Sequence, residues 1–248
     1  MANSVEKTMI ILRAIADSKD GPITPTRLSE KTGINISTLS HILRVLQKEG
    51  YVKRVSHNEG YTVGPELFFL TRYGRFGEEI TSSCHSILEY INKQTGGTAL
   101  FSVLHKGRKY IIDYVEGHVS YKDSGATILS DDLYRTVTGR KLLAALPTFE
   151  SLEVFRSQGV PEPSTWDEVK DEESFIRELQ KLSQTEIYVR LTTSRGRRLL
   201  SIATIINKNA KPVASLGLAV LADKVSEEAA VELIRRCKKE IERRLNFA

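Results

Sequence analysis

Residues 24–64 constrain the fold of this chain more than any other segment, because they predict two short helices, a tight turn and a hairpin. The hydroxyl of Thr24 can cap the first helix, and Pro25 can occupy its first position, where a missing N–H costs nothing. Gly33 follows about two helical turns later and supplies the positive φ that ends a helix. The order of these signals predicts a helix-turn-helix.

The second helix runs to about Lys48, and either Asn35 or Ser37 can cap it. Its apolar residues recur at helical spacing and predict one buried face, formed by Leu39, Ile42, Leu43 and Leu46. The other side carries small hydroxyls near its start and cations toward its end. The candidate DNA-reading residues of this side are Ser37, Thr38, Ser40, His41, Arg44 and Lys48. Such a face fits a major groove, so DNA binding is the first hypothesis.

The segment after this helix predicts a basic hairpin, the wing of a winged helix-turn-helix. Gly50 ends the helix, and the next strand carries Lys53 and Arg54, which can reach a phosphate backbone together with Arg27. Residues 26–54 contain six basic and two acidic side chains, although the whole chain has a net charge of only +5. This concentration favours a nucleic-acid surface over the alternative, a small helical domain with a merely solvated polar face.

The chain as a whole has 248 residues, enough for two modest domains, and 40% of them are hydrophobic. Because no apolar run approaches the ~20 residues needed to cross a bilayer, we expect no membrane partner. The first residues lack the order of a secretory signal, which predicts a cytoplasmic protein. Cys84 and Cys237 each lie on an apolar helical stripe, so we expect buried structural thiols.

The second half predicts an α+β domain with a mainly antiparallel sheet. Its expected helices are residues 78–94, 138–146, 149–157, 166–183 and 226–245, and its expected strands are 98–104, 109–115, 187–193, 199–206 and 213–221. We read residues 116–136 as irregular. The predicted organisation is a DNA-binding domain at 1–64, a linker helix at 65–77 and a second domain at 78–248.

The expected linker helix contains four adjacent large apolar residues, Leu67, Phe68, Phe69 and Leu70. Because such a run surrounds a helix on most sides, it predicts burial against more than one partner. Two interpretations stay open: the linker forms a dimer contact, or it packs under the wing.

Catalysis and metal binding find little support in the sequence. The chain has no G-x-S-x-G, no phosphate-binding P-loop, no G-x-G-x-x-G and no H-E-x-x-H. A site would have to be built from scattered residues that the fold happens to bring together, namely His85, His105, His118, Asp113, Glu116 and Asp123. We therefore predict no enzyme, no cofactor and no metal site.

Short segments along the whole chain closely resemble the isocitrate lyase regulator (IclR) family of transcriptional regulators. In the first half these are S-V-E-K at 4–7, L-S-E-K-T-G-I at 28–34, S-T at 37–38, L-Q-K-E-G-Y-V at 46–52 and Y-T-V-G-P at 61–65. In the second half they are T-V-T-G-R-K-L-L-A at 136–144, S-I-A at 201–203 and P-V-A-S-L at 212–216.

This resemblance implies a winged helix-turn-helix, a linker helix and a GAF-like effector-binding domain, assembled as a homodimer or a dimer of dimers. It implies a repressor or activator that binds a near-palindromic operator in double-stranded DNA and responds to a small organic acid or aromatic compound. The effector-binding positions that it implies are Leu129, Thr138, Gly139, Ser194, Ser201, Gly217 and Ala219.

The chain departs from the family pattern at this implied site. The family often has an acidic residue near 193–195 and serines on the last strand, where this chain has Gly217 and Ala219. The missing hydroxyls remove donors that could orient a carboxylate. One alternative is an anion site at residues 195–198, although a solvated hairpin tip is the favoured interpretation of this segment. Another is a second domain that has lost its ligand and serves only oligomerisation.

Overall fold

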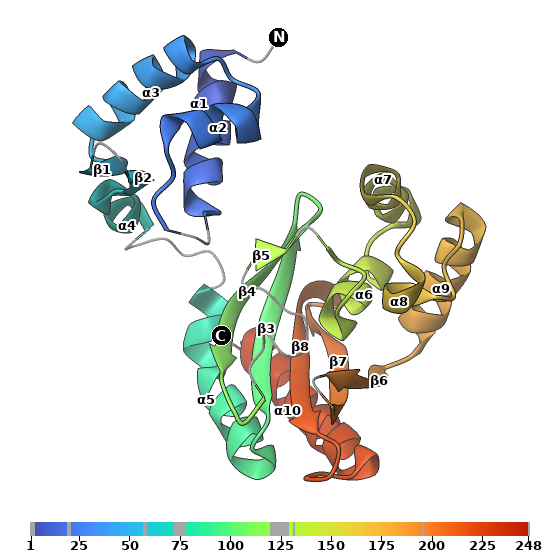
Figure 1. The fold of residues 1–248 in the computed structure, drawn as a ribbon. Helices are drawn as coiled ribbons and strands as arrows, with labels where there is room; N and C mark the ends of the chain where they lie inside the picture. The colour runs from blue at the N-terminus through green and yellow to red at the C-terminus, as the bar shows by residue number, and fades with distance from the viewer. Residues whose placement is uncertain are drawn as a thin grey trace. The chain divides into compact units, whose positions relative to one another are not determined.

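The computed structural model describes residues 3–18, 21–56, 59–71, 78–119, 129–130, 132–194 and 196–247. The chain divides into two compact units, residues 1–76 and 77–248, and each is described here by itself (Figure 1). None of the described helices is both long and apolar enough to cross a membrane.

The first unit is a winged helix-turn-helix. Its elements are α1 (Ser4–Ala16), α2 (Pro25–Thr32), α3 (Ile36–Lys48), β1 (Val52–Ser56), β2 (Gly60–Val63) and α4 (Pro65–Thr71). A single apolar core joins them, with Ile11, Leu28, Leu39 and Leu43 fully buried at its centre. A bridge between Ile23 and Tyr61 ties the wing to the loop before α2.

Local capping explains where the two helices of the motif begin and end. Thr24 Oγ1 accepts from the N–H of Arg27 at 3.4 Å, and Gly33 adopts a φ of 68°, so both predictions are confirmed. Of the two candidate caps of α3, Asn35 performs this role, because its Oδ1 accepts from the N–H of Thr38 at 2.9 Å.

The second unit is built on a six-stranded sheet with the order β5-β4-β3-β8-β7-β6, in which every pairing is antiparallel. Its strands are β3 (Thr98–His105), β4 (Arg108–Val115), β5 (Leu129–Ser130), β6 (Ile187–Ser194), β7 (Arg197–Lys208) and β8 (Lys211–Leu221). The structure thus confirms the predicted α+β class. Strand β5 was not predicted, because the segment that contains it has no apolar alternation.

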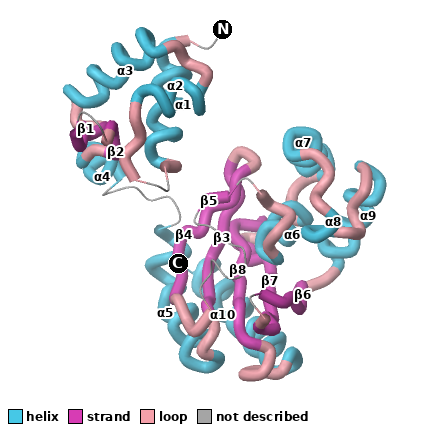
Figure 2. Tube along the Cα trace, viewed as in Figure 1, coloured by secondary structure: helices cyan, strands magenta, loops and turns pink. Residues whose placement is uncertain are grey.

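Helices cover both faces of this sheet (Figures 1 and 2). On one face, α5 (Glu78–Thr95) and α10 (Glu227–Phe247) enclose the main core, which includes the buried Cys84 and Cys237 as expected. On the other face lie α6 (Val137–Ala144), α7 (Thr148–Gln158), α8 (Pro163–Trp166) and α9 (Glu172–Gln184). Of these, α6 packs directly on β7 and β8.

The predicted single helix at 166–183 is wrong, because the structure has two helices, α8 and α9. Asp171 begins α9 with a capping box in which its side chain accepts from the N–H of Ser174 at 2.8 Å. Periodicity alone runs across this break, since Trp166 and Val169 are both buried.

Candidate functional site

The side of α3 that faces away from the core holds the predicted DNA-reading residues. Ser37, Ser40, His41, Arg44 and Lys48 are exposed, and Thr38 is half-buried beside them. The apolar side of the same helix is buried by Leu39, Ile42, Leu43 and Leu46. This separation leaves a polar surface two to three turns long with its cations toward the C-terminal end.

The predicted phosphate-contacting residues lie around this helix in the same unit. Lys53 and Arg54 are adjacent and exposed on β1, opposite Thr62 and Tyr61 of β2. The Arg54 guanidinium lies 5.8 Å from the centre of the Tyr61 ring, within the range of a cation–π contact. Arg27 is exposed on α2.

Apolar side chains are also exposed in this unit, on the first and last helices. Val5 and Met9 of α1 are 67% and 56% exposed, and Phe68 and Leu70 of α4 are 67% and 62% exposed. Among the described residues, packing under the wing therefore leaves Phe68, Phe69 and Leu70 exposed, and Leu67 is half-buried. The residues that follow, 72–77, lie outside the described part of the chain.

In the second unit, a small cleft of about 40 Å³ lies between the start of α6 and the sheet. Its lining residues are Leu100, Arg135, Thr136, Val137, Thr138, Arg190, Thr192, Ser201, Gly217, Leu218 and Ala219. Four of the seven implied effector positions are therefore among them: Thr138, Ser201, Gly217 and Ala219.

Of the remaining three implied positions, only Gly139 has described surroundings, and it does not line the cleft. Gly139 packs behind it, because a Cβ there would lie 2.3 Å from the carbonyl oxygen of Leu133. Leu129 pairs with Tyr110 and Ser194 pairs with Arg197 at the ends of the sheet, and both side chains lie outside the described part of the structure. Arg195, in the alternative anion site, is also outside it.

A steric constraint that the sequence does not reveal explains why position 217 is a glycine. A Cβ at this position would lie 2.6 Å from Cγ2 of Thr138 and 3.3 Å from Cδ1 of Leu100. The methyl group of Thr138 thus fills the space that a serine on this strand would occupy.

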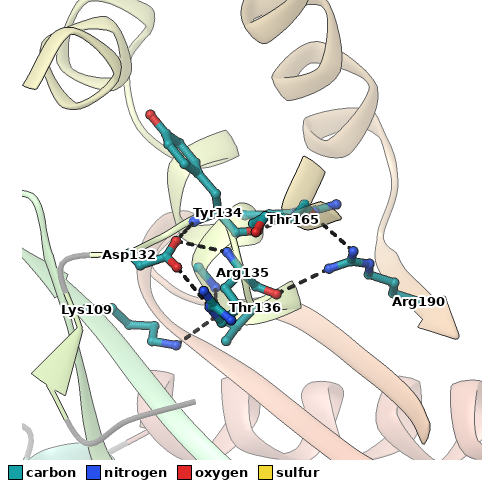
Figure 3. Close-up of polar contacts among 9 residues, drawn as sticks. Lys109, Asp132, Tyr134, Arg135, Thr136, Thr165 and Arg190 are labelled. Carbon is teal, nitrogen blue, oxygen red and sulfur yellow. Dashed lines mark hydrogen bonds and ion pairs between the residues drawn. The ribbon is translucent and has the colours of Figure 1, made fainter. Parts of the chain in front are cut away.

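Sequence reasoning missed two arginines of the cleft, Arg135 and Arg190. Arg190 donates to the carbonyl oxygens of Arg135 at 3.3 Å and Thr165 at 2.9 Å (Figure 3). Arg135 forms a partly exposed ion pair with Asp132, with 3.0 Å between Nε and Oδ2. The alternation of β6 places Arg190 and Thr192 on one face of the strand. This pattern in the sequence could have indicated Arg190 as a residue of the cleft.

Lys109 of β4 is also beside the cleft and is 0% exposed. Its Nζ donates to Thr136 Oγ1 at 2.7 Å (Figure 3). Burial lowers the pKa of Lys109 to about 8, and the negative charge of Asp132 opposes this shift. A buried cation is therefore next to the residue that caps α6.

Two further buried cations lie on α6 but have clear structural partners. Arg140 donates to the carbonyl oxygen of Tyr134 at 2.7 Å and lies 4.3 Å over the Trp166 ring. Lys141 donates to the carbonyl oxygens of Leu182 at 2.8 Å and Thr185 at 2.7 Å, where α9 ends. Burial, followed by repulsion from Lys238, lowers the pKa of Lys141 to about 8.

The scattered histidines and carboxylates do not converge on a metal site among the described residues. His85 Nδ1 and Asp113 Oδ2 are 2.9 Å apart, and this contact raises the pKa of the half-exposed His85. His105 ends β3, and His118 packs beside Gly96. Asp123 lies outside the described residues.

Comparisons with known proteins match both units to the same family of transcriptional regulators. Residues 4–56 match the IclR helix-turn-helix domain, and residues 77–243 match the C-terminal domain of the bacterial transcriptional regulator IclR. The chain is 27% identical to the HTH-type transcriptional regulator Rv1719 of Mycobacterium tuberculosis over 60% of its own length and 57% of that protein. It is 25% identical to the transcriptional repressor IclR of Escherichia coli over 46% of its own length and 42% of that protein. These matches thus span about half the length of the curated relatives.

Solved structures share the fold over nearly the whole chain. An IclR homolog from Microbacterium hydrocarbonoxydans, complexed with 4-hydroxybenzoate, has a TM-score of 0.79 at 17% identity and covers 98% of this chain and 99% of that one. The Thermotoga maritima IclR has a TM-score of 0.63 at 26% identity and covers 98% of each chain. With both units matched by family models, this chain belongs to the IclR family of bacterial transcriptional regulators.

Proposed function

We propose that the chain regulates transcription by sequence-specific binding of its first unit to double-stranded operator DNA. The observation that carries this proposal is the single exposed polar side of α3 with basic residues of the wing in the same unit. Ser37, Thr38, Ser40, His41, Arg44 and Lys48 would face the major groove. Lys53, Arg54 and Arg27 would contact phosphates and supply affinity without sequence information.

The regulator would act as a homodimer or a dimer of dimers on a near-palindromic operator. One α3 helix reads only a few base pairs, so two heads related by a two-fold axis are needed to build a selective site. The exposed apolar residues of α1 and α4 are the contact surfaces that we assign to this pairing. Since the named relatives include the E. coli transcriptional repressor IclR and the acetate operon repressor of Salmonella typhimurium, we propose repression as the direction of control.

The second unit would bind a small-molecule effector in the cleft beneath α6, an organic acid or an aromatic compound. The effector can change operator affinity only if it favours one arrangement of the two heads. A formed cleft with polar groups at one end favours this function over a domain that serves only oligomerisation. No enzymatic role is proposed, and a regulator of operator DNA would act in the cytoplasm.

Two alanine variants test the DNA-binding assignment. Arg44→Ala should reduce discrimination between the operator and a scrambled duplex by roughly 1–3 kcal/mol, because it removes a base-reading side chain. Lys53→Ala should weaken binding to both duplexes equally, because it removes a phosphate contact. Gel-shift titrations measure both, with Lys93→Ala on the exposed side of α5 as a matched control. Equal discrimination by wild type and Arg44→Ala would refute the assignment.

Effector binding is tested by the melting temperature of the full chain. A ligand that binds only the folded state must raise it, so a screen of small acids, sugars and aromatic compounds should find a concentration-dependent increase. Hits should then alter the operator affinity in a gel shift. A ligand that raises the melting temperature but leaves operator binding unchanged would contradict the proposed coupling.

A further inference from the structure

A second cavity of the second unit, of about 280 Å³, lies at the end of α6 and shares no lining residue with the cleft at its start. Its walls come from α6, the segment between α9 and β6, the last residues of β7 and the side of α10. The cleft at the start of α6 has only about 40 Å³. The second cavity is therefore close to the smallest volumes of small-molecule sites, about 300 Å³, and has room for several non-hydrogen atoms.

Two lysines from different helices line this cavity. Lys141 of α6 is 4% exposed, and the side chain of Lys238 of α10 is 13% exposed. Burial, followed by repulsion from Lys238, lowers the pKa of Lys141 to about 8, so Lys141 still carries most of its charge at neutral pH. Two positive charges that affect one another are thus kept beside one cavity and largely away from bulk water.

Lys141 has an N–H donor without an acceptor and a charge that is only partly compensated. Its Nζ donates to the carbonyl oxygens of Leu182 and Thr185, at 2.8 and 2.7 Å. An ammonium has three N–H donors, so one of them has no acceptor among the residues that the structure describes. These carbonyls belong to the end of α9, which supplies only about half a negative charge. The carboxylate of Glu186, which favours the charged form of Lys141, pairs instead with Arg235 at 3.1 Å.

Lys238 likewise has one N–H that its partners do not use. Its Nζ donates to the carbonyl oxygen of Ile205 at 2.6 Å and to Glu242 Oε1 at 2.7 Å. The same oxygen of Glu242 accepts from the backbone N–H and the side-chain amide of Asn207, at 2.8 and 3.1 Å. The second amide hydrogen of Asn207 has no acceptor in the described part of the chain. Three residues that line the cavity, Lys141, Lys238 and Asn207, therefore each retain a donor.

We propose that this cavity is a second ligand site, which takes a small oxyanion, either free phosphate or the phosphate group of a short organic compound, between Lys141 and Lys238. An oxyanion accepts from the remaining donors and offsets the uncompensated charge of Lys141, whereas water could do only the first. Ala144 and Pro212 add apolar surface on which a short carbon chain can pack. The proposal concerns a different site from the effector cleft and does not depend on operator binding.

Titration calorimetry of the full chain with sulfate and with inorganic phosphate tests the site, at an ionic strength matched with sodium chloride. Wild type should bind at least one of the two ions with a Kd of about 1 mM or below. Lys141→Met and Lys238→Met should each weaken binding about tenfold or more, because each removes a charge and a donor. Both variants keep every cation of the first unit, so a loss of affinity cannot come from anions bound there.

Two further variants separate anion binding from a folding defect. Ala145→Phe keeps both lysines and puts a ring into the cavity, so it should also weaken anion binding about tenfold or more. Lys181→Met is the matched control, because Lys181 lies on α9 with its side chain 65% exposed and does not line the cavity. It should bind sulfate and phosphate as wild type does. Circular dichroism identifies any variant that fails to fold, and Lys238→Met and Ala145→Phe then decide the outcome.

Glycerol phosphate, compared with glycerol and with inorganic phosphate, distinguishes the two sources of the oxyanion. Tighter binding of glycerol phosphate than of phosphate would assign the site to an organic phosphate, and equal or weaker binding would assign it to the free ion. Glycerol that binds as tightly as glycerol phosphate would overturn the proposal, because the charge would then contribute nothing.

Two other results would also overturn the proposal. One is anion binding that survives unchanged in folded Lys238→Met and Ala145→Phe. The other is the absence of sulfate and phosphate binding by wild type up to about 10 mM, which would leave water as the occupant of the cavity. A protein that binds no operator but binds phosphate through Lys141 and Lys238 would contradict the proposed regulatory function alone.

Discussion

The two units of the protein use positive charge in opposite ways. In the first unit, Arg44, Lys53 and Arg54 are exposed on one helix and one wing. In the second unit, Lys109 beside α6 and Arg140 on α6 are buried cations, only 0% and 3% exposed. Both sets suit anions or carbonyl oxygens, but only the exposed set keeps its hydration and its freedom to adjust.

This difference teaches which ligands each unit suits. An exposed lysine on a mobile stem gains affinity for any nearby phosphate and loses it as salt accumulates. A buried cation loses its hydration when the chain folds, so it must find fixed partners, and it then imposes geometry on whatever lies next to it. The first unit should bind a polyanion, and the second should discriminate among small molecules.

Of the predicted differences between the two units, the effect of salt on ligand affinity should be the largest. If each head of a dimer makes three to five phosphate contacts, raising monovalent salt from about 50 to about 200 mM should weaken operator binding by roughly a thousandfold or more. Effector binding in the cleft should change less than about threefold, because buried groups that line it, such as Thr138, are poorly screened. Operator titrations and calorimetry over one salt series measure both. Parallel losses at the two sites would break the comparison.

The next largest difference should be in the unfolding free energy lost when one arginine of each unit is replaced. Arg140→Met leaves the carbonyl oxygen of Tyr134 without its donor and removes the contact with Trp166, so it should cost about 3 kcal/mol of unfolding free energy. Arg44→Met should change the unfolding free energy by less than about 0.5 kcal/mol, because its side chain is exposed. Urea unfolding followed by circular dichroism gives both values, and similar losses would refute the structural role of Arg140.

The extent to which the sequence anticipates these features follows from the range of the interactions. The caps at Thr24 and Asn35, the turn at Gly33 and the polar side of α3 depend on residues a few positions apart, so local pattern is sufficient. Alternation likewise located five of the six strands. The break before α9 was missed because Asp171 and Ser174 form a cap inside a continuous helical period.

The cleft depends instead on contacts between distant residues. Lys109 and Thr136 are 27 positions apart, and a lysine on a strand gives no local sign that it is buried. The family resemblance placed Thr138, Ser201, Gly217 and Ala219 at the cleft but did not indicate that the Thr138 methyl occupies the space beside Gly217. Arg190 was missed although β6 alternates, because only the folded sheet brings β6 to α6, whereas Arg135 stands two residues before α6 in the sequence.

Alkaline pH should reveal the buried lysines at an intermediate magnitude. The pKa of Lys109 is about 8 in the folded protein and 10.5 in its ordinary state, so between these values the unfolded chain binds more protons. Stability from this group therefore rises with pH from about 8 to 10.5, by roughly 1–3 kcal/mol. Lys109→Met should lack the increase in stability that Lys109 contributes, and Lys141→Met should lack the separate increase that Lys141 contributes.

Urea midpoints between about pH 7 and 10 provide the measurement for these variants. Wild type should gain stability relative to Lys109→Met as the pH increases, because wild type gradually loses the cost of a buried charge. A difference that stays constant across this range would mean that Lys109 does not titrate in the folded protein, and its burial would have to be compensated by a stronger partner.

The smallest expected effect concerns exchange of lysine for arginine, which keeps the charge but changes the shape. Lys53→Arg should leave operator affinity within about twofold, because an exposed phosphate contact depends mainly on charge. Lys109→Arg should weaken effector binding several-fold, because a guanidinium does not fit the space of the fully buried Lys109 without displacing α6, whose first residues line the cleft. Gel shift and calorimetry measure the two variants. Were Lys53→Arg to change discrimination between operators, the wing would read bases as well as phosphates, and exposure alone would no longer distinguish the two kinds of cation.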